Sequence, residues 1–125
     1  MTSLPPPDII VTDRRLDRAD LARLVQGGFG TMVKFVVDLR RRTMAVGGEL
    51  HADGERLLLE GGSEQDDVWG GNYYPGRDSA DCVQFTALIN IRPARGNPGM
   101  EIADPAVRDA VRELASLLLG TGEPL

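Results

Sequence analysis

The sequence predicts a single α+β domain: a mostly antiparallel sheet with its helices packed on one face. One observation is that segments with alternating apolar residues, typical of strands, fall close together as 32–39 with 44–46, and as 68–74 with 83–91. Another is that segments with helical spacing of apolar residues precede, separate and follow these pairs. The expected order is (β)-α-β-β-α-β-β-α. A ferredoxin-like arrangement with an extra terminal helix is one form of it.

A chain of 125 residues suits one domain, which we place at residues 9–120. Residues 1–8, with three consecutive prolines at 5–7, are expected to be an N-terminal tail. Residues 121–125 are expected to be a C-terminal tail. The apolar run Ile9-Ile10-Val11 predicts a short first strand at an edge of the sheet.

Three helices are predicted from their ends and their apolar stripes. The first follows Asp17, a good N-cap, and stops at Gly27-Gly28. The second runs from about residue 50 to 60, and Gly54 on its apolar face would let it lie close to the sheet. The third is capped by Asp104, starts with Pro105 and ends by Gly120. Its apolar stripe is formed by Val107, Val111, Leu114 and Leu118.

The strands are predicted from alternation. A hairpin joins 32–39 to 44–46 through a turn at 40–43, and Gly47-Gly48 ends it. Segment 68–74 is a weaker strand, because Gly70-Gly71 mark a bulge or a weak point. Segment 83–91 has the strongest strand pattern in the chain, and 100–102 adds a further short strand.

Charge and composition limit the classes of function. A net charge of −5 disfavours general nucleic-acid binding, and the run Arg40–Arg42 fits a solvated turn better than a basic patch. The single cysteine, Cys82, cannot form an internal disulfide, so that nothing demands an oxidising compartment. The sequence shows no signal peptide and no membrane span, and we expect a cytoplasmic protein without cofactor.

Several phrases of the sequence occur together in a known family. They are Val37-Asp38, the run from Gly47 to Asp53, Asp67-Val68-Trp69-Gly70, Asn72 with Tyr74-Pro75, Ile89 to Pro93, Asn97, and Met100-Glu101-Ile102 before Asp104-Pro105. In this order, over roughly residues 30 to 119, the chain resembles a family of small bacterial proteins of unknown function. Gly54 stands where members of the family tend to have Ala. The resemblance implies one compact domain and no particular chemistry.

The candidate catalytic residues surround the only histidine. His51 and Glu55 are i and i+4 neighbours on the second helix, so a carboxylate could orient the imidazole as a general base. Glu49 and Asp53 flank the histidine. The alternative is a helix start enriched in acids, which the helix dipole favours in any protein. A metal site is not predicted, because there is a single histidine and no recognised ligand spacing.

The candidate ligand-binding residues lie on the polar face of segment 83–91 and in segment 68–74. Arg92 could clamp a carboxylate or phosphate, Asn90 could orient a polar group, and Trp69 and Asn72 could line the pocket. The alternatives are an arginine paired with a structural acid such as Glu101, and aromatic residues that cover a small core.

Two functions follow from these candidates. In the first, a small polar or anionic metabolite binds, and is hydrolysed or isomerised, between Glu49 and His51 on one side and Asn90 and Arg92 on the other. In the second, the chain is a non-catalytic, homodimeric interaction module that uses its open sheet face or terminal helix. An exposed apolar patch around Val36 and Leu88 would favour the second.

Overall fold

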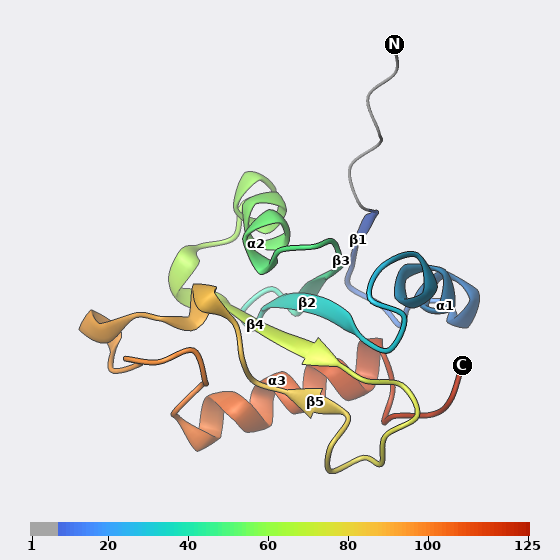
Figure 1. Ribbon diagram of the computed structural model, residues 1–125. Coiled ribbons are helices and arrows are strands. Elements are labelled where there is room, and N and C mark those ends of the chain that lie inside the picture. Colours follow the sequence, from blue (N-terminus) through green and yellow to red (C-terminus); the bar gives the residue numbers. More distant parts are fainter. Residues whose placement is uncertain (1–7) are drawn as a thin grey trace.

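The computed structural model describes residues 8–125 and shows a five-stranded sheet in which all neighbouring strands are antiparallel (Figure 1). The strand order is β1-β3-β2-β4-β5. The strands are β1 (Ile9–Thr12), β2 (Val33–Asp38), β3 (Thr43–Gly47), β4 (Val68–Tyr73) and β5 (Val83–Gln84). The helices are α1 (Arg18–Gly27), α2 (His51–Glu60) and α3 (Pro105–Leu118), with 3-10 turns η1 (Gln65–Asp67), η2 (Leu88–Asn90) and η3 (Pro93–Arg95). The α+β class and the antiparallel sheet are thus confirmed.

The helices cover both faces of the sheet, so the prediction of one covered face was wrong. Successive side chains of a strand point to opposite faces. On β2, Phe35 and Val37 therefore join the larger core, which also contains the apolar residues of α1 and α3. Val36 joins a smaller core with Leu58 of α2. Figure 1 shows α2 and α3 on opposite sides of the sheet.

The ferredoxin-like arrangement was also wrong. That arrangement places its fourth strand beside the first and packs its helices on one face of the sheet. Here β1, which precedes α1, pairs with β3 alone among the described strands, and β4 lies beside β2 instead. The first strand does lie at an edge of the sheet, as the sequence predicted.

The helix ends follow the sequence closely. The Asp17 carboxylate accepts a hydrogen bond from the Ala19 N–H at 2.7 Å, and the Asp104 carboxylate accepts one from the Ala106 N–H at 2.9 Å. The close approach of α2 also follows, because a Cβ built on Gly54 would lie 3.0 Å from Cγ2 of Val36. The helix therefore rests directly on the strands beneath it.

The prediction of a continuous strand over 83–91 was wrong. β5 pairs with β4 at only two positions, Asn72 with Gln84 and Tyr73 with Val83. The extended chain then pairs with the segment before α3: the Ile102 N–H donates to the Phe85 carbonyl at 3.0 Å, and the Ala87 N–H donates to the Met100 carbonyl at 3.1 Å. The turn η2 follows. In an extended segment apolar and polar residues alternate whichever partner the segment pairs with. The alternation over 83–91 therefore could not show that the pairing partner changes within it.

Side chains replace the missing strand along the outer edge of β4. Oδ1 of Asn90 accepts from the Gly70 N–H at 2.8 Å, and its Nδ2 donates to the Gly70 carbonyl at 3.0 Å. Nη2 of Arg92 donates to the Val68 carbonyl. Gly70 is required here, because a Cβ would lie 2.6 Å from Cβ of Ala87.

The predicted tails differ in what the structure describes. Residues 1–7 lie outside the described residues, while Asp8 forms an ion pair with Arg23 of α1. Residues 121–125 are not a free tail. The Gly122 N–H donates to the Tyr73 hydroxyl at 2.9 Å, and the Gly122 carbonyl accepts from the Gly76 N–H at 2.8 Å. The C-terminal end therefore holds the loop between β4 and β5.

Candidate functional site

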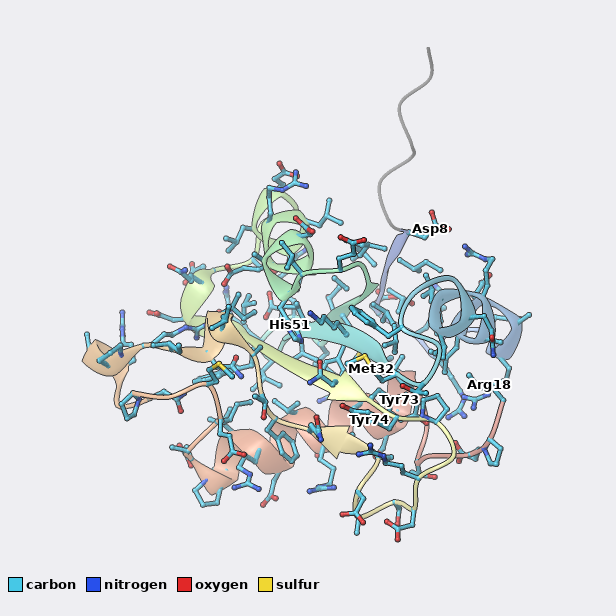
Figure 2. All side chains as sticks on the ribbon, in the orientation of Figure 1. Asp8, Arg18, Met32, His51, Tyr73 and Tyr74 are labelled. Carbon is cyan, nitrogen blue, oxygen red and sulfur yellow. The ribbon has the colours of Figure 1, made fainter. Side chains whose placement is uncertain are left out.

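His51 is the first residue of α2 and is half-buried against β4 (Figure 2). Its Nε2 lies 2.8 Å from the Gly71 carbonyl. Since a carbonyl only accepts, Nε2 carries the proton in this contact. Burial lowers the pKa of His51, and the Lys34 ammonium lowers it further, while the hydrogen bond to the Gly71 carbonyl and the nearby Asn72 side chain oppose these effects. The imidazole is therefore neutral near pH 7.

The acids expected around His51 form no hydrogen bond or ion pair with it among residues 8–125. The i, i+4 hydrogen bond to Glu55 is absent from the described residues, because the ring bonds to the Gly71 carbonyl instead. Glu49 is exposed, and its backbone carbonyl accepts from Nζ of Lys34 at 2.6 Å. Glu49 lines a separate hollow of about 550 Å³ with Phe29 and Leu50. The structure therefore assembles no carboxylate–histidine pair at the start of α2.

Arg92 is held at the other end of β4. Its guanidinium lies 4.6 Å from the centroid of the Trp69 ring, and burial lowers its pKa while nearby Glu55 and Asp66 raise it. Its Nε and Nη1, and Oε2 of Glu55, are buried without a hydrogen-bond partner among residues 8–125. Arg92 thus supports the β4 edge, and Glu55 is near enough to raise the pKa of Arg92 but forms no hydrogen bond with His51 among residues 8–125.

The predicted ligand-binding residues fall into separate groups. Asn72 lies next to His51, whereas Trp69 packs on the larger core, on the opposite face of β4. Asn90 is fully buried, and both hydrogens of its amide are used by the carbonyls of Gly70 and Met100. Asn90 therefore belongs to the fold and has no donor left for a ligand.

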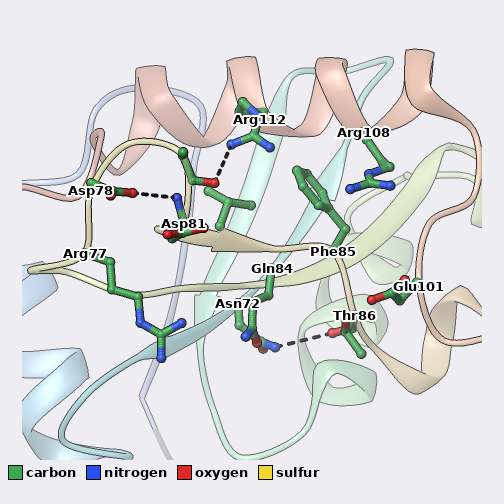
Figure 3. A pocket seen from close by; sticks show the side chains of 12 residues that line it. Asn72, Arg77, Asp78, Asp81, Gln84, Phe85, Thr86, Glu101, Arg108 and Arg112 are labelled. Carbon is green, nitrogen blue, oxygen red and sulfur yellow. Dashed lines mark hydrogen bonds between the residues drawn. The ribbon is translucent and has the colours of Figure 1, made fainter.

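The outer edge of β5 borders a groove of about 730 Å³, which we call the β5 groove (Figure 3). In Figure 3 the strand runs between two rows of side chains, with α3 above and Gln84 and Thr86 below. The charged residues of the groove come from the β4–β5 loop, α3 and the segment before α3. The full lining is Asn72, Arg77, Asp78, Ala80, Asp81, Val83, Gln84, Phe85, Thr86, Glu101, Arg108 and Arg112.

Three arginines in the β5 groove are held by aromatic rings rather than by acids. The guanidiniums of Arg108 and Arg112 each lie 5.1 Å from the centroid of the Phe85 ring, and that of Arg77 lies 3.6 Å from the Tyr74 ring. None of the three forms an ion pair in the part of the chain that the structure describes. Stacking fixes a guanidinium while leaving its N–H donors free.

The acids of the β5 groove do not neutralise these arginines by contact. Oδ1 of Asp78 accepts from the Asp81 N–H at 3.1 Å, which stabilises the loop itself. Arg112 donates only weakly, to the carbonyls of Ser79 at 3.4 Å and Ala80 at 3.5 Å. Guanidinium donors therefore remain available to a bound anion.

Sequence reasoning missed the β5 groove, apart from Asn72. Arg77 is distant in sequence from α3, so that only the fold brings the arginines together. One signal was readable: Arg108 and Arg112 lie one helical turn apart, next to the apolar stripe of α3. Such a pair lies at the border between the core and the surface.

Neither a metal-binding cluster nor a membrane-spanning helix is found among the described residues. Within residues 8–125 no group of three or more His, Cys, Asp or Glu side chains could hold a metal ion. No helix among these residues has the length and apolarity needed to cross a bilayer.

Comparison with known proteins places the chain in a family without an assigned activity. A family model described as "Protein of unknown function (DUF5674)" matches residues 9–118, and the chain belongs to this family. Neither a curated protein nor a solved structure matches the chain.

Proposed function

We propose that the protein binds a small anionic molecule in the β5 groove. The observation that carries this proposal is the set of three guanidiniums, on Arg77, Arg108 and Arg112, held over aromatic rings without a carboxylate partner among the described residues. Planar guanidiniums recognise carboxylates and phosphates through paired hydrogen bonds. The predicted anionic ligand is thus retained, but at a different place.

Binding is better supported than turnover. A general base must lie within hydrogen-bond reach of the bound molecule. His51 is not among the residues that line the β5 groove, and its Nε2–H is used by the Gly71 carbonyl. Asn72, which lines the groove and neighbours His51, is the one predicted site residue that the proposal keeps.

Calorimetric titration with succinate and with inorganic phosphate tests the proposal. We expect saturable binding of at least one of them, weakened about tenfold or more in Arg108→Gln, because a hydrogen bond to a charged group is worth about 1.5–3 kcal/mol. Arg56→Gln, an exposed arginine of α2 paired with Glu60, is the matched control and should bind like the wild type. Equal binding by the Arg108 and Arg56 variants would contradict the proposal, as would no binding of either anion.

A second candidate function is self-association, and one observation favours it. Val36 is only 2% exposed under α2, so the predicted open sheet face does not exist. Leu88, however, is 71% exposed, and Ile91 and Met100 are each 42% exposed. The turn η2 brings these three together, because the Leu88 carbonyl accepts from the Ile91 N–H and the Met100 carbonyl accepts from the Ala87 N–H. Contiguous exposed apolar side chains are typical of protein contacts.

Sedimentation velocity over a range of concentrations tests self-association. We expect a concentration-dependent dimer in the wild type and a monomer in Leu88→Ser. Leu117→Ser, which changes an exposed leucine of α3 outside this patch, is the control. A monomer at every concentration in the wild type would rule out this function.

A further inference from the structure

The floor of the β5 groove is an open strand edge. In an antiparallel ladder, alternate residues direct their backbone groups to opposite sides of the strand. The Cys82 carbonyl accepts from the Tyr74 N–H, so Cys82 and Gln84 face β4. The Phe85 carbonyl accepts from the Ile102 N–H on the other side. Val83 and Phe85 therefore direct their backbone groups away from β4, towards the groove.

Three of these outward groups have no partner within residues 8–125. They are the N–H and carbonyl of Val83 and the N–H of Phe85. Val83 and Phe85 both line the β5 groove. Figure 3 shows the Phe85 side chain on the α3 side of the strand, with Gln84 and Thr86 on the other side. An exposed edge of this kind is a template for one more strand.

The chain itself shows that this edge accepts a strand. Segment 100–102 pairs antiparallel with 85–87, through the bridge of Thr86 with Glu101 and the two hydrogen bonds beside it. The chain then turns away at Asp104 into α3. None of the described residues bonds to the outward backbone groups of Val83, the next outward-facing residue along this edge.

We propose that the anion bound in the β5 groove is part of an extended, acidic peptide segment that pairs with the outer edge of β5. This inference rests on the function proposed above and names its ligand class. Addition of a strand supplies the backbone bonds, and pockets beside the strand select alternate side chains. Val83 supplies the backbone bonds here, because Ile102 already lies beside Phe85. Arg108 and Arg112 face acidic side chains on one side of the added strand.

Charge complementarity selects this occupant over a second copy of β5. Pairing two β5 edges about a twofold axis would bring Arg77, Arg108 and Arg112 of one copy against the same three residues of the other. A second copy adds as many acids as arginines to the contact, namely Asp78, Asp81 and Glu101, so it supplies no net negative charge to these arginines. An acidic strand instead supplies the carboxylates that these arginines lack among the described residues.

Titration with a blocked peptide tests the inference. The probe is acetyl-Val-Glu-Val-Glu-Val-amide, and glutarate serves as the same carboxylate without a backbone. Two further peptides are N-methylated, one on every valine and one on every glutamate. In a paired strand only one of these alternate sets of N–H groups faces β5.

We expect the parent peptide to bind about tenfold tighter than glutarate, and one methylated peptide to bind about tenfold more weakly than the other, since only one of them loses the backbone hydrogen bonds to β5. Amide exchange at Val83 should slow with the peptide and not with glutarate. Peptide and glutarate of equal affinity, or two methylated peptides of equal affinity, would overturn the inference while leaving anion binding intact. Failure of both peptide and glutarate to bind would overturn anion binding as well.

Discussion

The outer edge of β4 has two ends, and they are treated differently. At the Val68–Gly70 end, the side chains of Asn90 and Arg92 take the place of a strand and satisfy the backbone. At the Asn72–Tyr73 end, a real strand pairs for two residues and leaves its own outer edge open. The Val68–Gly70 end is therefore sealed by side chains. At the Asn72–Tyr73 end, the unpaired outer edge of β5 borders the β5 groove.

Two buried asparagines, one at each end, show the same difference. Both hydrogens of the Asn90 amide are used at 3.0 and 3.1 Å, and Asn97 supports it by donating to the Asn90 carbonyl at 2.8 Å. Asn72 makes one long bond of 3.4 Å to the Thr86 carbonyl, and its Oδ1 has no partner among the described residues. The Asn90 amide is therefore fully used by the fold, whereas Asn72 keeps an acceptor that no described residue uses.

The largest expected effect is on stability at the sealed end. Asn90→Ala removes every bond to Gly70 and leaves its buried N–H and carbonyl without partners, which should cost about 2–4 kcal/mol. Asn72→Ala, the matched change at the open end, should cost under about 1 kcal/mol. Urea denaturation of both variants measures the two values. Equal losses would mean that the two ends do not differ as described.

An intermediate effect is expected from His51, which lies between the two ends. Burial lowers its pKa below 6.5, so the unfolded chain binds more protons between the folded-state pKa and 6.5. The free energy of unfolding should therefore fall as the pH drops from 6.5 through the folded-state pKa. His51→Gln, which keeps a donor for the Gly71 carbonyl, should flatten this part of the stability profile. Denaturation midpoints measured across this pH range, with Asp53→Asn as the control, check it; identical profiles for wild type and His51→Gln would contradict it.

The smallest effect is expected at the arginines of the β5 groove. Arg77 and Arg108 form no ion pair with the described residues, so Arg77→Gln and Arg108→Gln should each change the free energy of unfolding by less than about 1 kcal/mol. Thermal melts without ligand measure this change. A large loss of stability would show that these arginines hold the fold together, and would remove the reason to regard them as binding groups.

The sequence predicted those parts of the fold that local rules determine. The caps Asp17 and Asp104, the hairpin of β2 and β3, and Gly54 on the sheet-facing side of α2 were all readable, because each depends on neighbours in sequence or on a periodic pattern. The side of the sheet that α2 covers was not readable. A strand that is apolar on both faces, as β2 is, accepts a helix on either one.

The candidate site was less predictable, since its groups meet only through tertiary contacts. The sequence suggested that the Asn90 and Arg92 side chains bind a ligand. In the structure they bond to the backbone of Gly70 and Val68 in β4, and no local sequence pattern indicates these contacts. The single histidine drew attention, yet its partner is the Gly71 carbonyl, 20 residues away. The β5 groove depends on a loop, an edge strand and α3 coming together.

The only cysteine of the chain gives the β5 groove a built-in reporter of motion. Cys82 is 2% exposed, and burial raises the pKa of its thiol. Its Sγ lies 3.8 Å from the Ser79 carbonyl, inside the loop that carries Arg77 and Asp81. A thiol reagent needs both access and thiolate, so it can react only while this loop is open. The labelling rate of Cys82 therefore reports how often this loop opens. A ligand bound in the β5 groove would lower that rate.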